Sequence, residues 1–329
     1  MGANSNQPPP TVLVFGASGR IGGAVVSRLL EPHPNNPQRV IAAVRRPDAA
    51  ARLRAIGAEV RLIDLDSVEA RGLDALLPTL DGIDRVLLLT GYHVNMMLHS
   101  KAVIDAAVAS AVRQLVHVGV YARADTTIVH YGWHQMVEAY IQRCGVPFTF
   151  LQPNAFMQNL LMPVMVDPQR PGVLTHFTGR GRPSWIDTDD IADVAAEVLR
   201  NPGRHAGKVY PLATEAASMD DVAGLLTAVT GRLWSCEAKP PQEFFEAVTR
   251  FGADPVYMAC VRNVLERTAN GSLSEVSDVF DTVAQVCGHA PTTLRQFVEK
   301  HRSFFSPERG TKSLRSTIEC DDTTGREMA

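Results

Sequence analysis

The sequence has few cysteines, no long apolar run and no excess of charge of one sign. Its 329 residues include five scattered cysteines, with no C-x-x-C pair, so neither a disulfide framework nor a metal site is expected. No apolar run approaches a membrane span, and the polar, proline-rich N-terminal residues lack the apolar core of a signal peptide. The formal net charge of −3, with both signs intermixed, indicates no nucleic acid and no membrane surface as partner. We therefore expect a cytoplasmic protein with reduced cysteines.

The most informative segment is a strand-like run, residues 11–15, that leads directly into glycines spaced three apart. An apolar-periodic helix follows. A strand, a glycine-rich turn and a helix in this order bring backbone N–H groups and the positive end of a helix dipole to a pyrophosphate. We expect Gly16 to take the positive φ of the turn, Gly19 to let the phosphate approach, and Gly22 to let the helix pack close to the strand. The G-x-x-G-x-x-G spacing predicts a dinucleotide-binding site.

Two arginines, Arg45 and Arg46, follow the next predicted strand, where a doubly wound fold places the adenosine ribose. A carboxylate there would bond the 2′-hydroxyl of NAD, whereas a guanidinium group grips the 2′-phosphate of NADP. No carboxylate occurs there before Asp48, and Arg20 in the glycine turn is a further partner for the same phosphate. The pattern favours NADP(H) as the cofactor, with a solvated basic loop as the alternative.

Apolar strands alternate with helical segments through the first half of the chain. Strands are expected at 11–15, 39–44, 59–63, 85–90, 114–118 and 147–151, and helices near 48–56, 68–77, 94–110 and 132–143. This alternation predicts an α/β fold, a Rossmann-type doubly wound parallel sheet covered on both faces. Ligands of such sheets bind beyond the carboxyl ends of the strands.

The pattern changes after residue 153, where a Met-rich apolar segment and a proline- and glycine-rich segment follow. A helix is expected at 191–200 with Thr188 or Asp189 as its N-cap, and the chain from 218 onward is mostly helical. We predict an NADP-binding domain of residues 11–152 with about 184–213. A smaller, mostly helical substrate-binding lid would comprise 153–183 and 214–305. The polar ends, 1–10 and 306–329, are predicted to be disordered.

Taken in order, these motifs resemble the NmrA-like family of the atypical short-chain dehydrogenase/reductase superfamily. The resemblance runs from about residue 11 to 305. It rests on G-A-S-G-R-I-G at 16–22, V-R-R-P at 44–47, G-A-E-V-x-x-x-D-x-D at 57–66, V-E-x-Y-I-x-x-x-G-V-P-F-T at 137–149 and L-Q-P-N-x-F-M-Q-N-L at 151–160. Members are NADPH-dependent reductases or NADP-sensing regulators. The resemblance therefore implies a Rossmann domain that binds NADP and a small C-terminal domain beside the substrate cleft.

The resemblance also implies contacts along the cofactor. The pyrophosphate would be held by Gly16, Ser18, Gly19, Arg20, Ile21 and Gly22, and the 2′-phosphate by Arg45 with Arg46 or Arg20. The adenine would face Asp64 and Leu65, the nicotinamide ribose Thr90 and Gly91, and the nicotinamide the backbone groups of Pro153 and Asn154. Two of these residues have a purely structural alternative: Asp64 as a helix N-cap and Thr90 as an ordinary strand end.

The catalytic residues of the superfamily are only partly recognisable. The serine expected near 118–119 is absent, and His130 and His134 stand where the superfamily has the tyrosine and lysine of Y-x-x-x-K. Residues four apart share one helix face, and a histidine with an ordinary pKa of roughly 6.5 is able to act as a general acid near neutral pH. Alternatively, His134 only bonds the ribose and His130 caps a helix. Tyr121, Tyr131 and His93 are further candidates near the cleft.

Three functions stay open on the sequence alone. An NADPH-dependent oxidoreductase that transfers hydride to a carbonyl, imine or enone agrees best with the motifs, because hydride transfer needs mainly a well-oriented nicotinamide. The Met-rich segment favours a small apolar or aromatic substrate. The alternatives are an NADP(H)-sensing regulatory protein without turnover and a non-redox cyclase or isomerase that uses the same pocket. The sequence indicates neither the substrate nor the oligomeric state.

Overall fold

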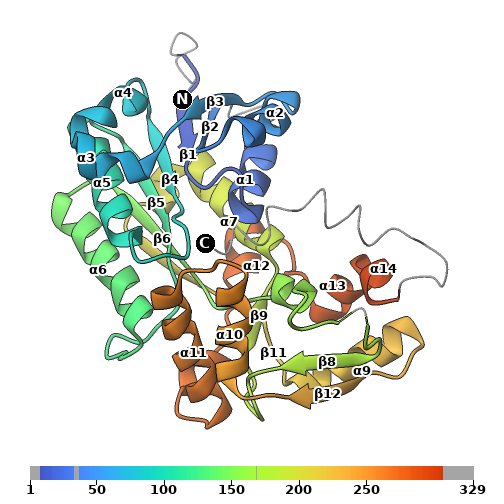
Figure 1. Ribbon diagram of the computed structural model, residues 1–329. Helices are drawn as coiled ribbons and strands as arrows, with labels where there is room; N and C mark the ends of the chain where they lie inside the picture. The colour runs from blue at the N-terminus through green and yellow to red at the C-terminus, as the bar shows by residue number, and fades with distance from the viewer. Residues whose placement is uncertain (1–7, 33–36, 168, 307–329) are drawn as a thin grey trace.

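A seven-stranded sheet forms the centre of the protein (Figure 1), whose computed structural model describes residues 8–32, 37–167 and 169–306. Its order is β10-β6-β5-β4-β1-β2-β3, and every neighbouring pair is parallel. The strands are β1 (Thr11–Val14), β2 (Arg39–Val44), β3 (Glu59–Leu62), β4 (Arg85–Leu88), β5 (Gln114–Val118), β6 (Phe148–Pro153) and β10 (Lys208–Leu212). The predicted Rossmann-type sheet is confirmed. Because the order reverses between β1 and β4, the carboxyl ends of these strands border the crevice expected to bind a ligand.

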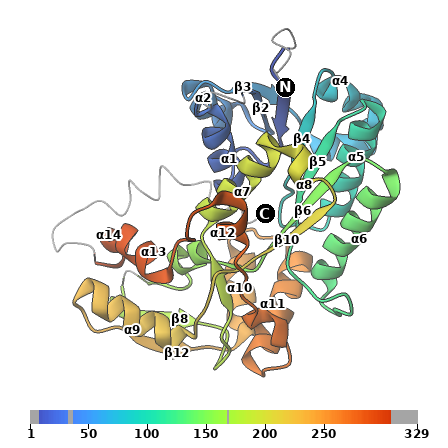
Figure 2. The same cartoon turned by 180° about the vertical axis from the view of Figure 1, so that it is seen from behind.

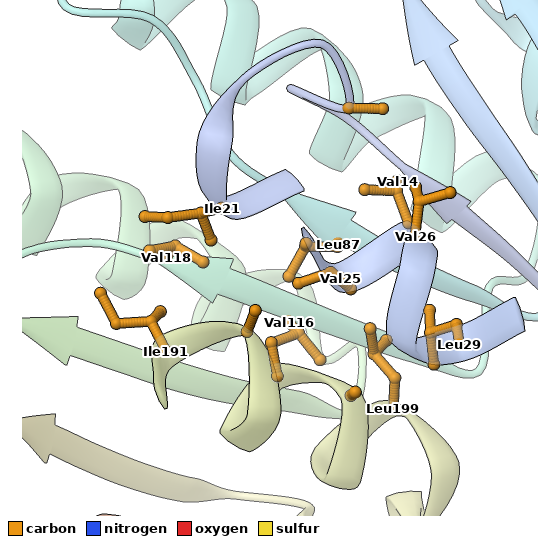
Figure 3. Packing of buried hydrophobic residues seen from close by; sticks show 14 of the residues in the cluster. Val14, Ile21, Val25, Val26, Leu29, Leu87, Val116, Val118, Ile191 and Leu199 are labelled. Atoms are coloured by element: carbon orange, nitrogen blue, oxygen red, sulfur yellow. The ribbon is translucent and has the colours of Figure 1, made fainter. Parts of the chain in front are cut away.

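Helices cover both faces of the sheet because successive side chains of a strand point to opposite sides. Val12 and Val14 pack toward α1 (Arg20–Leu30) and α7 (Thr188–Arg200). Leu13 and Phe15 belong to the core under α5 (Met96–Ala109) and α6 (Val129–Cys144). Figure 3 shows the first of these cores. Helix α1 contributes Ile21, Val25, Val26 and Leu29, helix α7 contributes Ile191 and Leu199, and the strands contribute Val14, Leu87, Val116 and Val118.

Short helices connect the strands on the β2–β4 side. They are α2 (Pro47–Ala55), η1 (Leu65–Ser67), α3 (Val68–Arg71), η2 (Leu73–Ala75) and α4 (Leu77–Leu80). The single helix predicted at 68–77 is therefore wrong. Gly72 ends α3 with a φ of +70°, a left-handed conformation that breaks the helical path.

A second, smaller region lies at the lower side of Figure 1. It holds a three-stranded sheet of β7 (Ala155–Phe156), β9 (Ser184–Ile186) and β11 (Glu215–Ala216), and a two-stranded sheet of β8 (Val173–His176) and β12 (Ser235–Ala238). Its helices are η3 (Met157–Leu161), α9 (Met219–Thr230), α10 (Pro241–Arg250), α11 (Pro255–Ala269), η4 (Ser274–Ser277), α13 (Leu294–Lys300) and α14 (Arg302–Phe305). These elements share a separate core rich in methionine and aromatic side chains, which includes Met157, Met219, Trp185, Phe297 and Tyr257.

Three local features differ from the sequence expectations. Helix α7 is capped by Asp187, whose Oδ1 accepts the N–H of Asp189, so the caps predicted at 188 and 189 are wrong by one or two residues. Helix α12 (Thr282–Cys287) lies against α7 in Figure 2, and Val283 joins the sheet core although the segment was expected in the lid. Helix α8 (Pro202–His205) precedes β10, and neither element was among those expected from the sequence. Most of the predicted disordered ends, 1–10 and 306–329, lies outside the described residues.

Candidate functional site

The glycine turn between β1 and α1 has the geometry of a phosphate cradle. Gly16 has a φ of +69°, as expected, and its carbonyl accepts the N–H of Gly19 at 3.0 Å. A Cβ on Gly22 would lie 2.2 Å from that carbonyl oxygen, so packing alone requires glycine there. A Cβ on Gly19 would meet only the same oxygen at 3.4 Å, an ordinary contact. The fold therefore does not require the open space beside Gly19.

Helix α1 begins beside this open space with unpaired polar groups. Its first-turn N–H groups, which include those of Arg20, Ile21 and Gly22, have no intrahelical acceptor by helix geometry. No side chain caps the helix and no acidic residue stands in its first turn. The positive helix end is therefore free to bind an anion. The residues present thus fit the pyrophosphate of a dinucleotide.

Three arginines near the end of β2 are held in different ways. Arg46 forms two hydrogen bonds with Asp48, at 3.1 and 2.9 Å, so a carboxylate already occupies its guanidinium group. Arg45 is exposed and lies 3.4 Å from Asp66. Arg52 of α2 donates to the carbonyl of Ser18 in the glycine turn at 3.1 Å. Among the described residues no carboxylate lies within ion-pair distance of Arg52, which the sequence analysis did not identify as a site residue.

The segment predicted to face adenine is structured by its own side chains. The Asp64 carboxylate accepts the N–H of Asp66 at 3.1 Å and caps η1, the turn that contains Leu65, so the structural alternative for Asp64 is realised. Nε2 of His99 on α5 lies 3.0 Å from the Asp66 carboxylate, and the His93 ring is 4.9 Å from that of His99. Burial lowers the pKa of both histidines. His93 therefore lies near His99 and Asp66, next to the segment that was expected to face adenine.

The ends of β4 and β6 hold the other predicted contacts. Thr90 and Gly91 lie in the loop after β4, separated from its end by one residue, and Gly91 is exposed. The Pro153 carbonyl accepts the N–H of Tyr121 at 2.9 Å. The N–H of Asn154 donates to Leu212, and its side-chain amide donates to Ser184 at 2.9 Å and to the carbonyl of residue 276 at 3.1 Å. The Pro153 carbonyl and the Asn154 N–H thus already have backbone partners, and the expected contact of these two residues with the nicotinamide stays a prediction.

Helix α6 brings both candidate histidines into the protein. It begins at Val129, so His130 and His134 are one turn apart and both are buried. Nδ1 of His134 lies 3.3 Å from Nε2 of His117, a fully buried residue of β5 that the sequence analysis did not single out. Burial lowers the pKa of His117 and His130 to about 3 and that of His134 to about 4. The premise of a histidine charged near neutral pH is therefore wrong, and His130 is not a cap because residue 128 takes that place.

Glu138 lies one further turn along the same face of α6. Both of its carboxylate oxygens accept from Nε2 of Gln152 on β6, at 3.0 and 2.9 Å. Burial raises the pKa of Glu138 to about 7, and the bond from Gln152 lowers it by less. A buried carboxyl that titrates near neutral pH is a common feature of functional sites.

The two candidate tyrosines are poor acids in this structure. The Tyr121 hydroxyl donates to Asp278 at 2.7 Å, and burial together with this carboxylate raises the pKa of Tyr121 to about 12. Tyr131 is buried against the His130 ring at 4.6 Å, and burial raises its pKa. Neither hydroxyl is poised to release a proton near neutral pH. Their catalytic role, like that of the two histidines, stays a prediction.

Aromatic side chains gather where α6, α11 and the loop after β4 meet. The ring of Tyr257 lies 5.1 Å from that of His130, 5.5 Å from Tyr92 and 6.2 Å from Trp133. Tyr257 is buried and Tyr92 is 37% exposed, so the group extends from the histidines to the surface. These rings form an apolar wall beside the candidate catalytic residues.

Residues 8–298 match the model of the NmrA-like family. The chain belongs to the NmrA-like family. An NAD(P)H azoreductase of Xenophilus azovorans is 33% identical to this NmrA-like protein over 296 residues, which cover 89% of the chain and 99% of the azoreductase. A (4-alkanoyl-5-oxo-2,5-dihydrofuran-3-yl)methyl phosphate reductase of Streptomyces griseus is 28% identical over 300 residues, 90% of the chain and 100% of that reductase.

Solved structures share the fold of the NmrA-like protein. An NADPH-dependent quinone oxidoreductase of Escherichia coli, complexed with NADPH, superposes with a TM-score of 0.74 at 25% identity, covering 88% of this chain and 99% of its own. The negative transcriptional regulator NmrA in complex with NADP has a TM-score of 0.71 at 14% identity, with 93% and 99% covered, which shows the fold alone. The predicted family is confirmed.

The described part of the chain holds neither a cluster of metal-binding side chains nor a membrane-spanning helix. Within 8–32, 37–167 and 169–306, no three histidine, cysteine, aspartate or glutamate side chains are grouped so as to hold a metal ion. In the same part of the chain, no helix combines the length and apolar character needed to cross a membrane.

Proposed function

We propose that this NmrA-like protein is an NAD(P)H-dependent oxidoreductase that reduces a small apolar organic substrate, with NADPH as the preferred cofactor. One observation carries the proposal. Packing explains why residue 22 is a glycine but not why residue 19 is one, and Gly19 leaves open space beside the first-turn N–H groups of α1. This space suits a pyrophosphate. When bound, the nicotinamide supplies hydride, and this chain's residues orient and enclose the reactants.

The preference for NADPH is proposed from two guanidinium groups near the end of β2 and the glycine turn, the region where a Rossmann-type fold binds the adenosine ribose. Arg45 stands at the end of β2, and Arg52 is anchored to the glycine turn through Ser18. Arg46 contributes less because Asp48 holds it in two hydrogen bonds. A 2′-phosphate would give both guanidinium groups a charge-assisted partner that NAD lacks, in addition to the single long contact of Arg45 with Asp66 and the bond of Arg52 to the Ser18 carbonyl.

The substrate class is proposed from the wall around Tyr257. Aromatic rings at its sides favour a flat, conjugated substrate by stacking and apolar contact. Carbonyl, imine and enone groups fit this description, and the names of an azoreductase and a quinone oxidoreductase among the relatives add azo and quinone groups to the candidates. We propose residues 11–152 with 184–213 as the part that binds the cofactor, and the region around α10 and α11 as the part that contacts the substrate.

Two measurements test the proposed function. Calorimetric titration should show binding of NADPH, and anaerobic mixing of the NADPH complex with azo dyes, quinones, enones, imines and aldehydes should oxidise the cofactor with at least one class. Binding without oxidation by any compound would favour the sensing alternative. No binding of either NADPH or NADH would contradict the proposal.

A further inference from the structure

Helix α6 carries three polar side chains at four-residue intervals, His130, His134 and Glu138. Side chains at this spacing form a row along one helix face. A fully solvated helix face would explain such a row, but both histidines are buried and Glu138 is only partly exposed. Burying polar groups is unfavourable unless they find partners, so this row requires another explanation.

The row ends beneath Gly119, the residue that follows β5 at the edge of the crevice. A Cβ on Gly119 would lie 3.0 Å from Oε1 of Glu138 and 3.3 Å from Nε2 of His117. The same His117 nitrogen lies 3.3 Å from Nδ1 of His134. The Glu138 carboxyl and the His117 imidazole therefore both lie close to Gly119, and the His134 imidazole contacts the same His117 nitrogen. These groups lie just below the strand ends where a Rossmann-type sheet binds its ligand.

One member of the row lacks a partner within the described part of the chain. Nδ1 of His130 is buried there and has no hydrogen-bond partner. Native structures contain few such atoms, and a catalytic role is one of the reasons for which they occur. His130 stands at the crevice end of the row, because α6 starts beyond the carboxyl end of β5. The His130 ring also contacts Tyr257 of α11.

We propose that Glu138 stores the proton that the substrate takes up during reduction, and that His134 with His117 connects this carboxyl to the cleft. This inference rests on the proposed NAD(P)H-dependent reduction. The substrate receives hydride on one atom of its double bond, and the other atom, left with the electron pair of that bond, takes a proton from the imidazole relay. The relay is refilled by the Glu138 carboxyl, and water re-protonates the carboxylate. One hydride and one proton are consumed in each turnover.

The other titratable groups at the cleft do not serve this role. Burial keeps His117, His130 and His134 neutral at neutral pH, and Tyr121 and Tyr131 hold their protons more tightly than usual. Glu138 accepts from the uncharged Gln152 of β6 and shares the surroundings of Gly119 with His117 of β5, while His134 lies one turn away on its own helix and contacts that His117. A carboxyl that keeps its proton up to about pH 7 matches the ideal of an acid whose pKa lies near the working pH.

Glu138→Gln tests the proposal, because the amide keeps the shape of the side chain and removes the proton. Single-turnover oxidation of NADPH by methyl red and by menadione should slow by about a hundredfold, the lower end of the usual contribution of a proton donor. The wild-type rate should fall as pH rises through about 7, where the Glu138 carboxyl loses its proton, and the variant should lose this limb. The affinity for NADPH should be unchanged. Glu299→Gln on the exposed surface of α13 is the matched control.

A second variant separates proton storage from packing. Gln152→Met removes the N–H that stabilises the carboxylate, so the limb of the pH profile should move to higher pH while the rate below it is kept. Infrared difference spectroscopy of the carboxyl band, assigned with Glu138→Gln, should show the same shift without any substrate. An unchanged rate and limb in Glu138→Gln would overturn the role of Glu138 and leave the proposed reduction standing. A wild type that oxidises NADPH with neither probe would remove the reaction on which the inference rests.

Discussion

Replacing Gly19 by valine should separate folding from cofactor binding. The backbone at Gly19 is extended, with a φ of −79° and a ψ of 173°, so any residue can adopt it. An added Cβ meets only the Gly16 carbonyl at an ordinary 3.4 Å. The loss of a glycine cap on α1 costs about 1 kcal/mol, which lowers the melting temperature by roughly 2–4 °C.

The same side chain should abolish binding because it fills the space through which a pyrophosphate reaches the helix N-terminus. NADPH at a concentration of about 100 Kd stabilises the wild type by about 2.7 kcal/mol, a rise in melting temperature of roughly 5–10 °C. We expect no rise in the variant when both are measured by calorimetry with and without NADPH. Gly22→Ala is the contrasting control, since its Cβ would lie 2.2 Å from a backbone oxygen and should destabilise the fold itself. A folded Gly19→Val protein that binds NADPH like the wild type would refute this description of the turn.

Four further predictions follow from the same geometry. Arg45→Ala and Arg52→Ala should each weaken NADPH binding about tenfold relative to NADH, as expected for one charge-assisted bond, whereas Arg46→Ala should leave the ratio of the two dissociation constants unchanged. His134→Ala should slow single-turnover NADPH oxidation by about a hundredfold at unchanged cofactor affinity, and a small effect would make this histidine structural. The pKa values of the buried histidines lie below their unfolded value, so the stability they provide is present above about pH 6.5 and is lost as pH falls toward about 4; denaturant titrations across this range should show that loss. The pKa of Glu138 lies above its unfolded value of 4.5, so the stability that the carboxyl provides is lost as pH rises through about 7. Glu138→Gln should therefore be more stable than the wild type by up to about 3 kcal/mol at about pH 8 and equal to it near pH 4. Equal stability of the two proteins at both pH values would contradict the shift.

The sheet and the glycine turn are the parts that the sequence predicts well. The apolar strands carry their own signal because both faces of a parallel sheet are buried. Gly16 and Gly22 could be assigned roles because the reasons for these glycines are local: Gly16 needs a positive φ, and Gly22 packs on the backbone of Gly16 and Ala17 in the turn before the helix. The broken helix at 68–77 shows the limit of such patterns, since one glycine at 72 ended a segment that was otherwise helical in character.

The polar cluster under the crevice was only half visible in the sequence. His130 and His134 were found because they stand at the positions of a known motif, whereas His117 reads as one more residue of the buried strand Q-L-V-H-V. Its contact with His134 depends on how α6 packs against β5, which no local pattern contains. The pKa of each group depends on the same burial, so the ordinary value used for a free histidine did not apply here.

The arginine contacts show the same division between local and tertiary information. Arg45 and Arg46 follow a strand end and were predicted as a pair, but Asp48, only two residues away, holds one of them. Arg52 lies on an exposed helix that reads as an ordinary charged surface. It gains its possible role only because α2 passes beside Ser18, 34 positions earlier in the chain.

Hydride transfer from a bound nicotinamide is tested most directly with NADPH that carries deuterium at the transferred position. The protein would be mixed anaerobically with this cofactor and methyl red in a single turnover, beside unlabelled NADPH, and the label would be read in the rate because deuterium on nitrogen exchanges with water. We expect the nicotinamide absorbance and the dye colour to be lost together, and both to be lost more slowly with the deuterated cofactor. Bound NADPH that stays unoxidised with this dye and with menadione, or equal single-turnover rates with the two cofactors, would contradict hydride transfer as the function of this site.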